Sequence, residues 1–434
     1  METRRVLLAL GLASVVVVPH QAAPTGLTLG VRGRSNANVS LAADGRFVVA
    51  VWAASVPGGA TDIYAATSGD GGVTFQAPAR VNATPGDARV NGEQPPRATL
   101  TRRSGAAPTT TIVWTSKGER GTRILSARSE DGGRTFGRTE PMPGGDAEGN
   151  RGWESAAVDV AGRVRVAWLD HRDMAPTGAA GVTMQHHHEG HERAPAVTRD
   201  GVAMAQQSAL YMATIGDPSS PRILTRGVCY CCKTALVTGP DGAVYVAWRH
   251  VYPGNLRDVA FAMSRDGGRT FSSPLRVSED RWQLDGCPDD GPSMARAADG
   301  RLHIVWPTLV SGDGPGAAPT IGLFHATSRE GTTFSPRVRV PTEGVPHHPQ
   351  LVVASNGTLV QVWDELQGGK RRAVLALGAV AGDGRVTFRR QALSSGDAAV
   401  YPTVAPTLDG VVVAWTSTES GASVIRVERR SVSG

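Results

Sequence analysis

Four cysteines have the most distinctive spacing of any chemically active residues in this 434-residue chain. Three of them stand together as Cys229, Cys231 and Cys232, and the fourth is Cys287. In an exported protein, an even number of cysteines first predicts disulfides, with Cys287 bridging to one of the three. The two remaining cysteines would then form either a C-x-x-C-type bridge or a strained vicinal one.

A metal site is the other interpretation of these cysteines. Thiolate and imidazole ligands favour copper or zinc, and the candidate imidazoles are His347 and His348. The histidine-rich tract at residues 185–192 can bind the same ions, but a tract without fixed ligand spacing is more often a solvated loop. The pattern itself requires no cofactor, so metal and disulfide stay open as alternatives.

The tryptophans indicate the scaffold that must position these residues. Seven β-rich runs end in Trp52, Trp114, Trp168, Trp248, Trp306, Trp363 and Trp415, at spacings of 62, 54, 80, 58, 57 and 52 residues. Most of the runs follow an Asp-Gly or Asn-Gly turn and alternate in polarity, which is typical of antiparallel meanders. The spacing matches one four-stranded propeller blade with its loops. The sequence therefore predicts a seven-bladed β-propeller of four-stranded antiparallel sheets, with a six-bladed ring and an additional hairpin as the alternative.

A second marker repeats in register with the tryptophans. The octet Ser-x-Asp-Gly-Gly-x-Thr-Phe occupies residues 68–75, 129–136 and 264–271, with weaker copies at 328–334 and 383–388. An aspartate can accept the N–H groups of a tight turn, and the glycines tolerate the positive φ that such a turn needs. We expect these turns between the third and fourth strands of their blades, on the face opposite to the blade entries.

The blades are expected to run in chain order and to close through the N-terminus. Blade one spans 38–82 and blade two 91–143, and the later blades begin at 150, 229, 287, 347 and 401, with an insertion in the third. The last repeat offers only three strands, so the segment 27–31 would supply the fourth and remove the exposed edges.

Residues 1–23 have the form of a secretory signal, with Arg4 and Arg5 before the apolar run 6–18. We therefore expect a periplasmic or secreted protein whose residues 24–434 form one propeller domain. No later segment is apolar enough to span a membrane. The net charge of +6 is spread along the chain, which argues against a nucleic-acid-binding stripe. A monomer that binds a glycan or an acidic small molecule is the expected state.

Polar residues cluster where the blades begin, and in a propeller these entries meet at one mouth of the central channel. Salt bridges between blades are the alternative explanation for any single one of them. The set is Glu93, Arg97, Arg151, Trp153, Glu154, Asp170, His171, Arg172, Arg249, His250, Tyr252, Arg257, Asp289, Asp290, His347, His348, Asp364, Glu365 and Tyr401, together with the cysteines.

The octets are Asp-boxes, or BNR repeats, and the chain resembles the sialidase superfamily of β-propellers over nearly its whole length. The Cys-x-Cys-Cys run with a later Gly-Cys-Pro resembles a bacterial secreted subgroup of these propellers. The likeness implies an arginine triad that holds a sugar carboxylate through bidentate bonds. Two departures stand against it: sialidases have six blades, and residues 34–39 lack the Phe/Tyr-Arg-Ile-Pro motif of the first triad arginine.

The resemblance also suggests roles for particular residues. Tyr401 resembles the family's tyrosine nucleophile because it opens the last blade, and a glutamate and an aspartate would serve it as base and acid. The candidate catalytic residues are Tyr401, Glu365, Asp170 and Glu154, and the candidate substrate-binding residues are Arg97, Arg172, Arg249, Arg257 and Trp153. The expected function is a glycan-binding or exo-α-sialidase-like hydrolytic propeller. The alternative is a non-hydrolytic binding scaffold with a Cys/His metal site.

Overall fold

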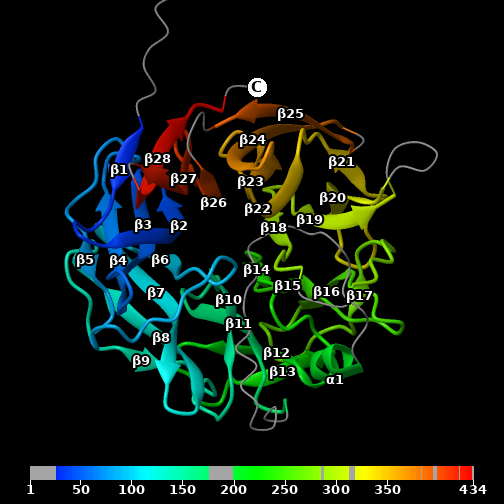
Figure 1. The fold of residues 1–434 in the computed structure, drawn as a ribbon, viewed down its shortest axis with the longest axis horizontal. Coiled ribbons are helices and arrows are strands. Elements are labelled where there is room, and N and C mark those ends of the chain that lie inside the picture. The colour runs from blue at the N-terminus through cyan, green and yellow to red at the C-terminus, as the bar shows by residue number, and fades with distance from the viewer. Residues whose placement is uncertain are drawn as a thin grey trace, which may run out of the picture.

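The chain forms a closed ring of seven four-stranded antiparallel sheets (Figure 1). The computed structural model describes residues 26–174, 199–284, 288–311, 318–382, 384–393, 398–419 and 421–432. The expected signal segment, the histidine-rich tract, Cys287 and the first residue of the 383–388 octet lie outside these ranges. The prediction of seven blades is confirmed, and the six-bladed alternative is wrong.

The first three blades follow the order predicted from the tryptophan runs. Blade one contains β2 (Ser35–Asp44), β3 (Phe47–Ser55), β4 (Thr61–Ser68) and β5 (Ala79–Arg80). Blade two contains β6 (Arg97–Arg103), β7 (Ala106–Gly118), β8 (Gly121–Ser129) and β9 (Glu140–Pro141). Blade three contains β10 (Arg151–Val158), β11 (Val164–Asp170), β12 (Ala209–Thr214) and β13 (Arg222–Arg226), with helix α1 (Arg199–Gln207) in its insertion.

The remaining blades repeat the same plan. Blade four contains β14 (Ala235–Thr238), β15 (Val244–Arg249), β16 (Val259–Ser264) and β17 (Leu275–Arg276). Blade five contains β18 (Ser293–Arg296), β19 (Leu302–Val310), β20 (Thr320–Ser328) and β21 (Val338–Val340). Blade six contains β22 (Val345–Val353), β23 (Leu359–Gln367), β24 (Lys370–Val380) and β25 (Val386–Ala392).

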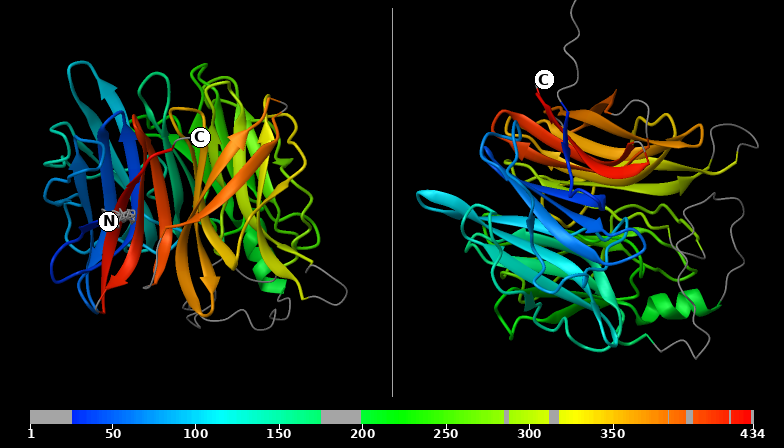
Figure 2. Two further views of the ribbon diagram at one scale, coloured as in Figure 1. Left: turned by 90° about the horizontal axis from the view of Figure 1, so that it is seen from above. Right: turned by 60° about the vertical axis from the view of Figure 1, so that its left-hand side comes forward.

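Blade seven joins the two ends of the chain. Its strands β26 (Ala399–Thr407), β27 (Gly410–Glu419) and β28 (Ala422–Arg430) are completed by β1 (Leu27–Leu29), which pairs antiparallel with β28. In Figures 1 and 2 the first strand accordingly lies beside the last. The predicted closure by residues 27–31 is confirmed, and it leaves the ring without an open end.

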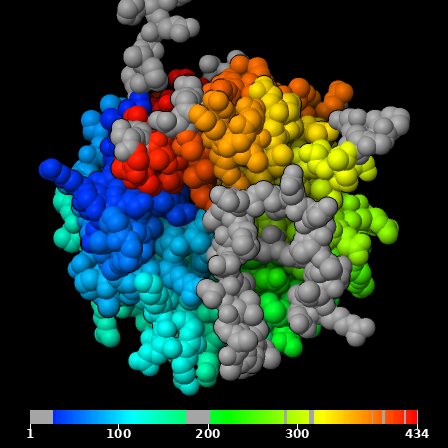
Figure 3. Space-filling model, in the orientation of Figure 1, coloured from blue at the N-terminus to red at the C-terminus, as the bar shows by residue number. Residues whose placement is uncertain are grey.

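The core consists of seven apolar clusters, and each cluster joins two neighbouring blades. Every predicted tryptophan lies on the second strand of its blade and is at most 4% exposed. Because these side chains fill the seams between sheets, truncating one would cost roughly 3–5 kcal/mol. Figure 3 shows the resulting surface, on which the colours follow the chain around the ring.

The aspartate turns lie between the third and fourth strands, as predicted. In the first one, Asp70 accepts the backbone N–H groups of Val73 and Thr74, both at 2.9 Å, and Ser68 Oγ accepts the N–H of Gly72 at 2.8 Å. The same contacts recur around Asp131 and Asp266. Among the described residues no helix is long and apolar enough to cross a membrane.

Candidate functional site

A strand bulge recurs at the entries of the blades. The pairing register shifts where β2, β10, β22 and β26 begin, and the bulge residues Asn38, Trp153, His348 and Tyr401 have positive φ. Asp289, before β18, shares this conformation. A bulge bends its strand and redirects the adjacent side chains, and non-glycine residues with positive φ concentrate at functional sites. The repeated bulge therefore explains why unlike polar groups meet at the channel mouth.

Glu93 connects three blades across this mouth. Its carboxylate accepts Lys233 Nζ at 2.9 Å, the backbone N–H of Lys233 at 3.1 Å and that of Gly291 at 2.7 Å. The side chains of Glu93 and Lys233 are 1% and 3% exposed. A charge pair this deeply buried depends on such bonds, because each charge alone would be strongly unfavourable away from water.

Two aspartate–histidine pairs lie in the next two blades. Asp290 is 2.6 Å from His347 Nδ1 and accepts the backbone N–H of His348 at 2.7 Å. Asp364 is 2.7 Å from His348 Nδ1 and also binds Arg371. Burial lowers the pKa of His348, but the charges of Asp364 and Asp290 outweigh burial and raise it. His348 is therefore held close to its charged form.

Tyr401 covers these pairs. Its ring centroid lies 4.2 Å from that of His348, and its backbone N–H donates to Asp364 at 3.2 Å. A Cβ atom at Gly92 would lie 2.0 Å from the tyrosine hydroxyl, so position 92 has room only for glycine. Burial and the charges of Asp289 and Asp364 raise the pKa of Tyr401, which keeps the phenol protonated at neutral pH.

Two acids near this group have strongly raised pKa values. Burial raises the pKa of Glu154 to about 7, and burial together with the charge of Glu93 raises that of Asp289 to about 7. Each carboxyl has one buried oxygen, Glu154 Oε1 or Asp289 Oδ1, without a hydrogen-bond partner in the described part of the chain. Groups that titrate near neutral pH are suited to moving protons.

The pocket beside Tyr401 combines residues from several blades. It is lined by Val39, Gly92, Glu93, Pro95, Arg97, Lys233, His348, Gln350, Tyr401, Pro402 and Thr403. A channel cavity of about 170 Å³ shares four of these residues and takes at least one lining residue from the first strand of each blade. The predicted residues Tyr401, Arg97 and His348 are thus brought together, and Arg97 Nε donates to the carbonyl oxygen of Glu154 at 2.9 Å.

Asp170 and Glu365, predicted as catalytic, instead make contacts that hold their blades. Each stands two residues after a blade tryptophan and accepts its indole N–H, at 2.9 Å for Asp170 and 2.8 Å for Glu365. Their carboxylates also pair with arginines, Arg172 with Asp170 and Arg390 with Glu365. His250 has the same place after Trp248. The carboxylate that contacts Tyr401 is Asp364.

The predicted substrate-binding groups other than Arg97 are engaged elsewhere. Arg249 donates to the carbonyl oxygens of Asp290, Arg257 and Pro307. Arg257 donates to Leu284 O and to Cys229 Sγ. Arg172 stacks on Tyr211, and Trp153 is 5% exposed and packs against His171. The carboxylate-binding triad implied by the sialidase resemblance is therefore not assembled from Arg97, Arg249 and Arg257.

Two groups of side chains have the composition of metal sites. One is Cys229, Cys231 and Cys232, and the other is Asp290, His347 and His348; within each group the ligand atoms lie within 4.8 Å of one another. The predicted joining of the cysteines to His347 is not seen, because the two groups are separate. Arg257 and Arg249 hold positive charge beside Cys229, which disfavours a metal cation at the thiols.

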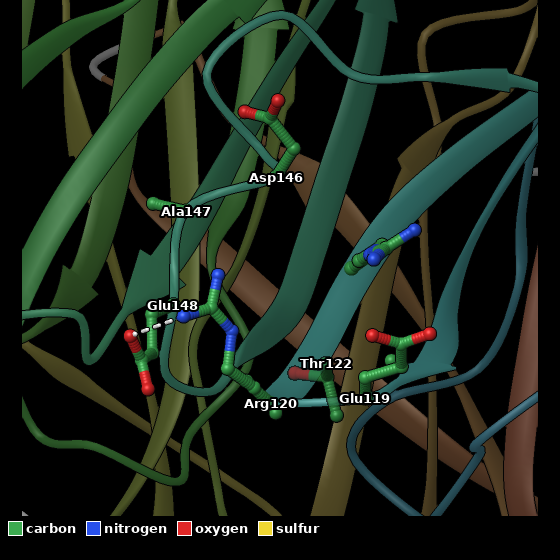
Figure 4. A pocket seen from close by; sticks show the side chains of 9 residues that line it. Glu119, Arg120, Thr122, Asp146, Ala147 and Glu148 are labelled. Atoms are coloured by element: carbon green, nitrogen blue, oxygen red, sulfur yellow. Dashed lines mark hydrogen bonds and ion pairs between the residues drawn. The ribbon is translucent and has the colours of Figure 1, made fainter.

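A second hollow lies away from this mouth, on the rim (Figure 4). It is formed by residues 118–123 of the β7–β8 hairpin and by residues 146–148. Its ion pair, Arg120 with Glu148 at 3.2 Å, joins side chains that are 74% and 67% exposed. Exposed ion pairs are screened by water and bind weakly, so this hollow lacks the buried charges of the Tyr401 pocket.

Lys233, Arg371 and Gly92 are parts of the site that sequence reasoning missed. Lys233 directly follows the cysteine run, and Gly92 directly precedes Glu93, so proximity to predicted residues was an available signal. Arg371 begins the third strand of blade six, where the sequence carries no motif.

No family model and no curated protein matches the chain. Among solved structures, an ulvan lyase of polysaccharide lyase family PL25 is similar, with a TM-score of 0.56, 11% identity and coverage of 93% of this chain and 96% of that chain. The GH93 α-L-arabinofuranosidase of Fusarium graminearum has a TM-score of 0.48, 11% identity and coverage of 94% and 98%. The NanB sialidase from Streptococcus pneumoniae has 0.46, 12%, and 93% and 70%. The likeness to the lyase shows a shared fold.

Proposed function

We propose that this propeller binds and processes a glycan with a carboxylated sugar at the Tyr401 pocket. The observation that carries the proposal is the convergence of Tyr401, His348, Arg97 and Lys233 on one pocket at the channel mouth. The similar ulvan lyase has been seen with a chain containing glucuronate, which is a carboxylated sugar. A cationic pocket with a hydroxyl donor suits such a ligand.

The charges around the pocket suggest how the sugar would be held. Arg97 lines the pocket while its Nε is fixed by Glu154 O, so its guanidinium is oriented before a ligand arrives. Lys233 and Arg371 add positive charge but are already paired with Glu93 and Asp364. Arg97 is therefore the cation that we assign to the sugar carboxylate, and oriented donors lower the cost of binding.

The chemistry would use the tyrosine hydroxyl and a neighbouring carboxyl group. In an exo-α-sialidase-type reaction, Tyr401 would attack the anomeric carbon after giving its proton to a carboxylate, and a carboxylic acid would protonate the leaving oxygen. Asp289 is the carboxyl that we assign to this exchange, because its charge acts on the Tyr401 phenol and one of its oxygens has no hydrogen-bond partner among the described residues.

Turnover of carboxylated glycans by the purified chain tests the proposal. We would measure a fluorogenic sialoside for hydrolysis, and uronate polysaccharides for new reducing ends and unsaturated uronate. Tyr401→Phe is expected to lower kcat/KM by at least about 100-fold, whereas Tyr64→Phe, in blade one, should leave it unchanged. Absence of both turnover and binding across these substrates would refute the proposal.

Gly92 provides a second test that leaves the reactive groups in place. Gly92→Ala puts a methyl group where the Tyr401 hydroxyl lies, so we expect the tyrosine to be displaced and turnover to fall. Gly382→Ala is the matched control, because a Cβ atom there meets nothing within 4 Å. Equal activity of the two variants would contradict the assigned position of Tyr401.

Zinc or copper binding by a non-hydrolytic propeller is the second candidate function. The observation that favours it is the proximity of the ligand atoms of Asp290, His347 and His348. Elemental analysis of the protein as purified would detect such an ion. A stoichiometric metal together with full binding of glycan by Tyr401→Phe would favour this candidate over the hydrolase.

We also propose that the protein is exported to the periplasm or secreted. The support is the sequence of residues 1–23, with two arginines before an apolar run and alanines at 22 and 23. Cell fractionation with N-terminal sequencing tests this proposal, and a cytoplasmic protein that retains Met1 would refute it.

A further inference from the structure

The cysteine run contains a pair of thiols at C-x-x-C spacing. Cys229 and Cys232 are free cysteines, both are 1% exposed, and Cys232 Sγ lies 3.5 Å from Cys229 Sγ. Cys231 lies 3.7 Å and 3.9 Å from the other two sulfurs and has a further interaction of its own. The two sulfurs of the pair are thus already in contact, and about 1.5 Å of approach would bring them to disulfide distance.

The surroundings of the pair are strongly positive. Arg257 Nη1 donates to Cys229 Sγ at 3.2 Å, and Arg249 lies on the same side. Burial raises the pKa of Cys229, but the hydrogen bond from Cys232 and the charges of both arginines outweigh burial and lower it to about 6. Burial and the bond donated to Cys229 raise the pKa of Cys232, and Glu93 adds to this effect. The pair therefore holds one thiolate and one thiol.

We propose that Cys229 and Cys232 form an oxidation-sensitive dithiol, in which Cys229 is the reacting sulfur and Cys232 resolves it to a disulfide. The geometry points to oxidation in preference to metal binding, because two guanidinium groups already compensate the thiolate charge. Since both sulfurs are buried, the oxidant must be small, and hydrogen peroxide is the class that fits. This inference is independent of the proposed glycan chemistry.

The reaction balances with peroxide as the only co-reactant. The Cys229 thiolate attacks one peroxide oxygen, the O–O bond breaks, and hydroxide leaves and takes a proton from solvent. Cys229 is then a sulfenic acid. The sulfur of Cys232 attacks the sulfur of Cys229, the S–O bond breaks, and the oxygen leaves as water with the Cys232 proton. Two electrons pass from the two sulfurs to peroxide, which becomes two molecules of water.

Oxidation would reach the channel mouth through the next residue. Lys233 follows Cys232 directly, and both its backbone N–H and its Nζ bind Glu93 in the Tyr401 pocket. The thiolate also disappears as a partner of Arg257. A disulfide at 229–232 is therefore expected to shift the Glu93–Lys233 pair.

Peroxide treatment of the full chain tests the proposal. Digestion after Arg226 and Lys233 yields the peptide 227–233, which should lose two hydrogen atoms after treatment with stoichiometric peroxide and regain them with a reductant. The native protein should lose two titratable thiols at the same time. If these thiols stay reduced in the native protein, or if they are protected by stoichiometric copper or zinc, the proposal is overturned.

Variants separate the two sulfurs. Cys232→Ser should stop the reaction at the sulfenic acid, which a dimedone adduct on Cys229 would reveal, and Cys229→Ser should give no adduct. Arg257→Gln should slow oxidation near neutral pH at least about tenfold by raising the thiol pKa. Arg102→Gln, on an exposed arginine that pairs with Asp44, is its control. A dimedone adduct on Cys232 and none on Cys229 would reverse the roles and refute the assignment.

Discussion

Carboxylates on the two faces of this ring have opposite surroundings. On one face, Asp70, Asp131 and Asp266 lie in the turns between third and fourth strands and accept side-chain and backbone donors, which lower their pKa values. At the channel mouth, Glu154 and Asp289 are removed from water, and their pKa values rise to about 7. The same chemical group thus stabilises a turn on one face and is available for proton transfer on the other.

The difference follows from how each face satisfies its carboxylates. A turn aspartate meets the N–H groups of its own octet, so its partners lie within six residues along the chain. At the channel mouth the partners come from other blades, as Lys233 and Gly291 do for Glu93. Local donors make a robust turn, whereas assembled donors leave some oxygens without partners and keep the site reactive.

The largest expected effect comes from neutralising Glu93. Glu93→Gln leaves the Lys233 cation buried without its charge partner, so we expect the free energy of unfolding to fall by about 3–5 kcal/mol. Denaturant unfolding measures this loss. The double variant Glu93→Gln/Lys233→Met should lose less than the sum of the two single variants. A loss below about 1 kcal/mol would show that the pair is as weak as a surface ion pair.

A smaller effect should appear in the pH dependence of stability. Burial raises the pKa of Glu154 from 4.5 to about 7, so between these values the native state holds a proton that the unfolded state releases. Stability from this group is therefore full below pH 4.5 and is lost as the pH rises through about 7, by up to about 3 kcal/mol.

Unfolding of wild type and Glu154→Gln at several pH values measures this contribution, and the variant should lack the decline. Asp131→Asn, on the other face, should differ from wild type in the opposite sense. The lowered pKa of Asp131 contributes stability above its unfolded value, and that stability is lost in acid. Parallel pH profiles for the two variants would contradict the contrast between the faces.

The fold was predictable because its signals are local and repeated. Tryptophans at strand ends, turn dipeptides and octets each depend on neighbours a few residues away, and they recur often enough to count the blades. The closing strand β1 was also predictable, because the last repeat lacked a fourth strand and residues 27–31 had no other partner.

The site was only partly predictable, because its contacts cross blades. The sequence placed Tyr401, Arg97 and His348 at blade entries, but it could not show that they share a pocket. It also assigned catalysis to Glu365 when the neighbouring Asp364 contacts Tyr401. Strand alternation separates these two side chains, since residues one apart point to opposite faces. Glu365 faces its blade tryptophan, and Asp364 faces His348.

The smallest expected effect concerns the serines of the turns. Ser68 Oγ accepts the N–H of Gly72 and donates to Asp70 at 2.6 Å, so Ser68→Ala should cost about 1 kcal/mol of unfolding free energy. Ser129→Ala should cost the same, because its contacts repeat those of Ser68. Ser328→Ala should cost less, because Glu330 replaces the aspartate and the serine keeps its bond to the N–H of Gly331.

These serine variants also sharpen the contrast between the faces. Because the turns lie opposite the channel mouth, none of the three substitutions should alter turnover at the Tyr401 pocket or oxidation of the cysteine pair. Thermal unfolding, glycan turnover and thiol titration on the same preparations measure all three properties. A serine variant that changes turnover while its stability is unaffected would show that the two faces are coupled, because a local turn defect confined to one face cannot reach the other through an unperturbed ring.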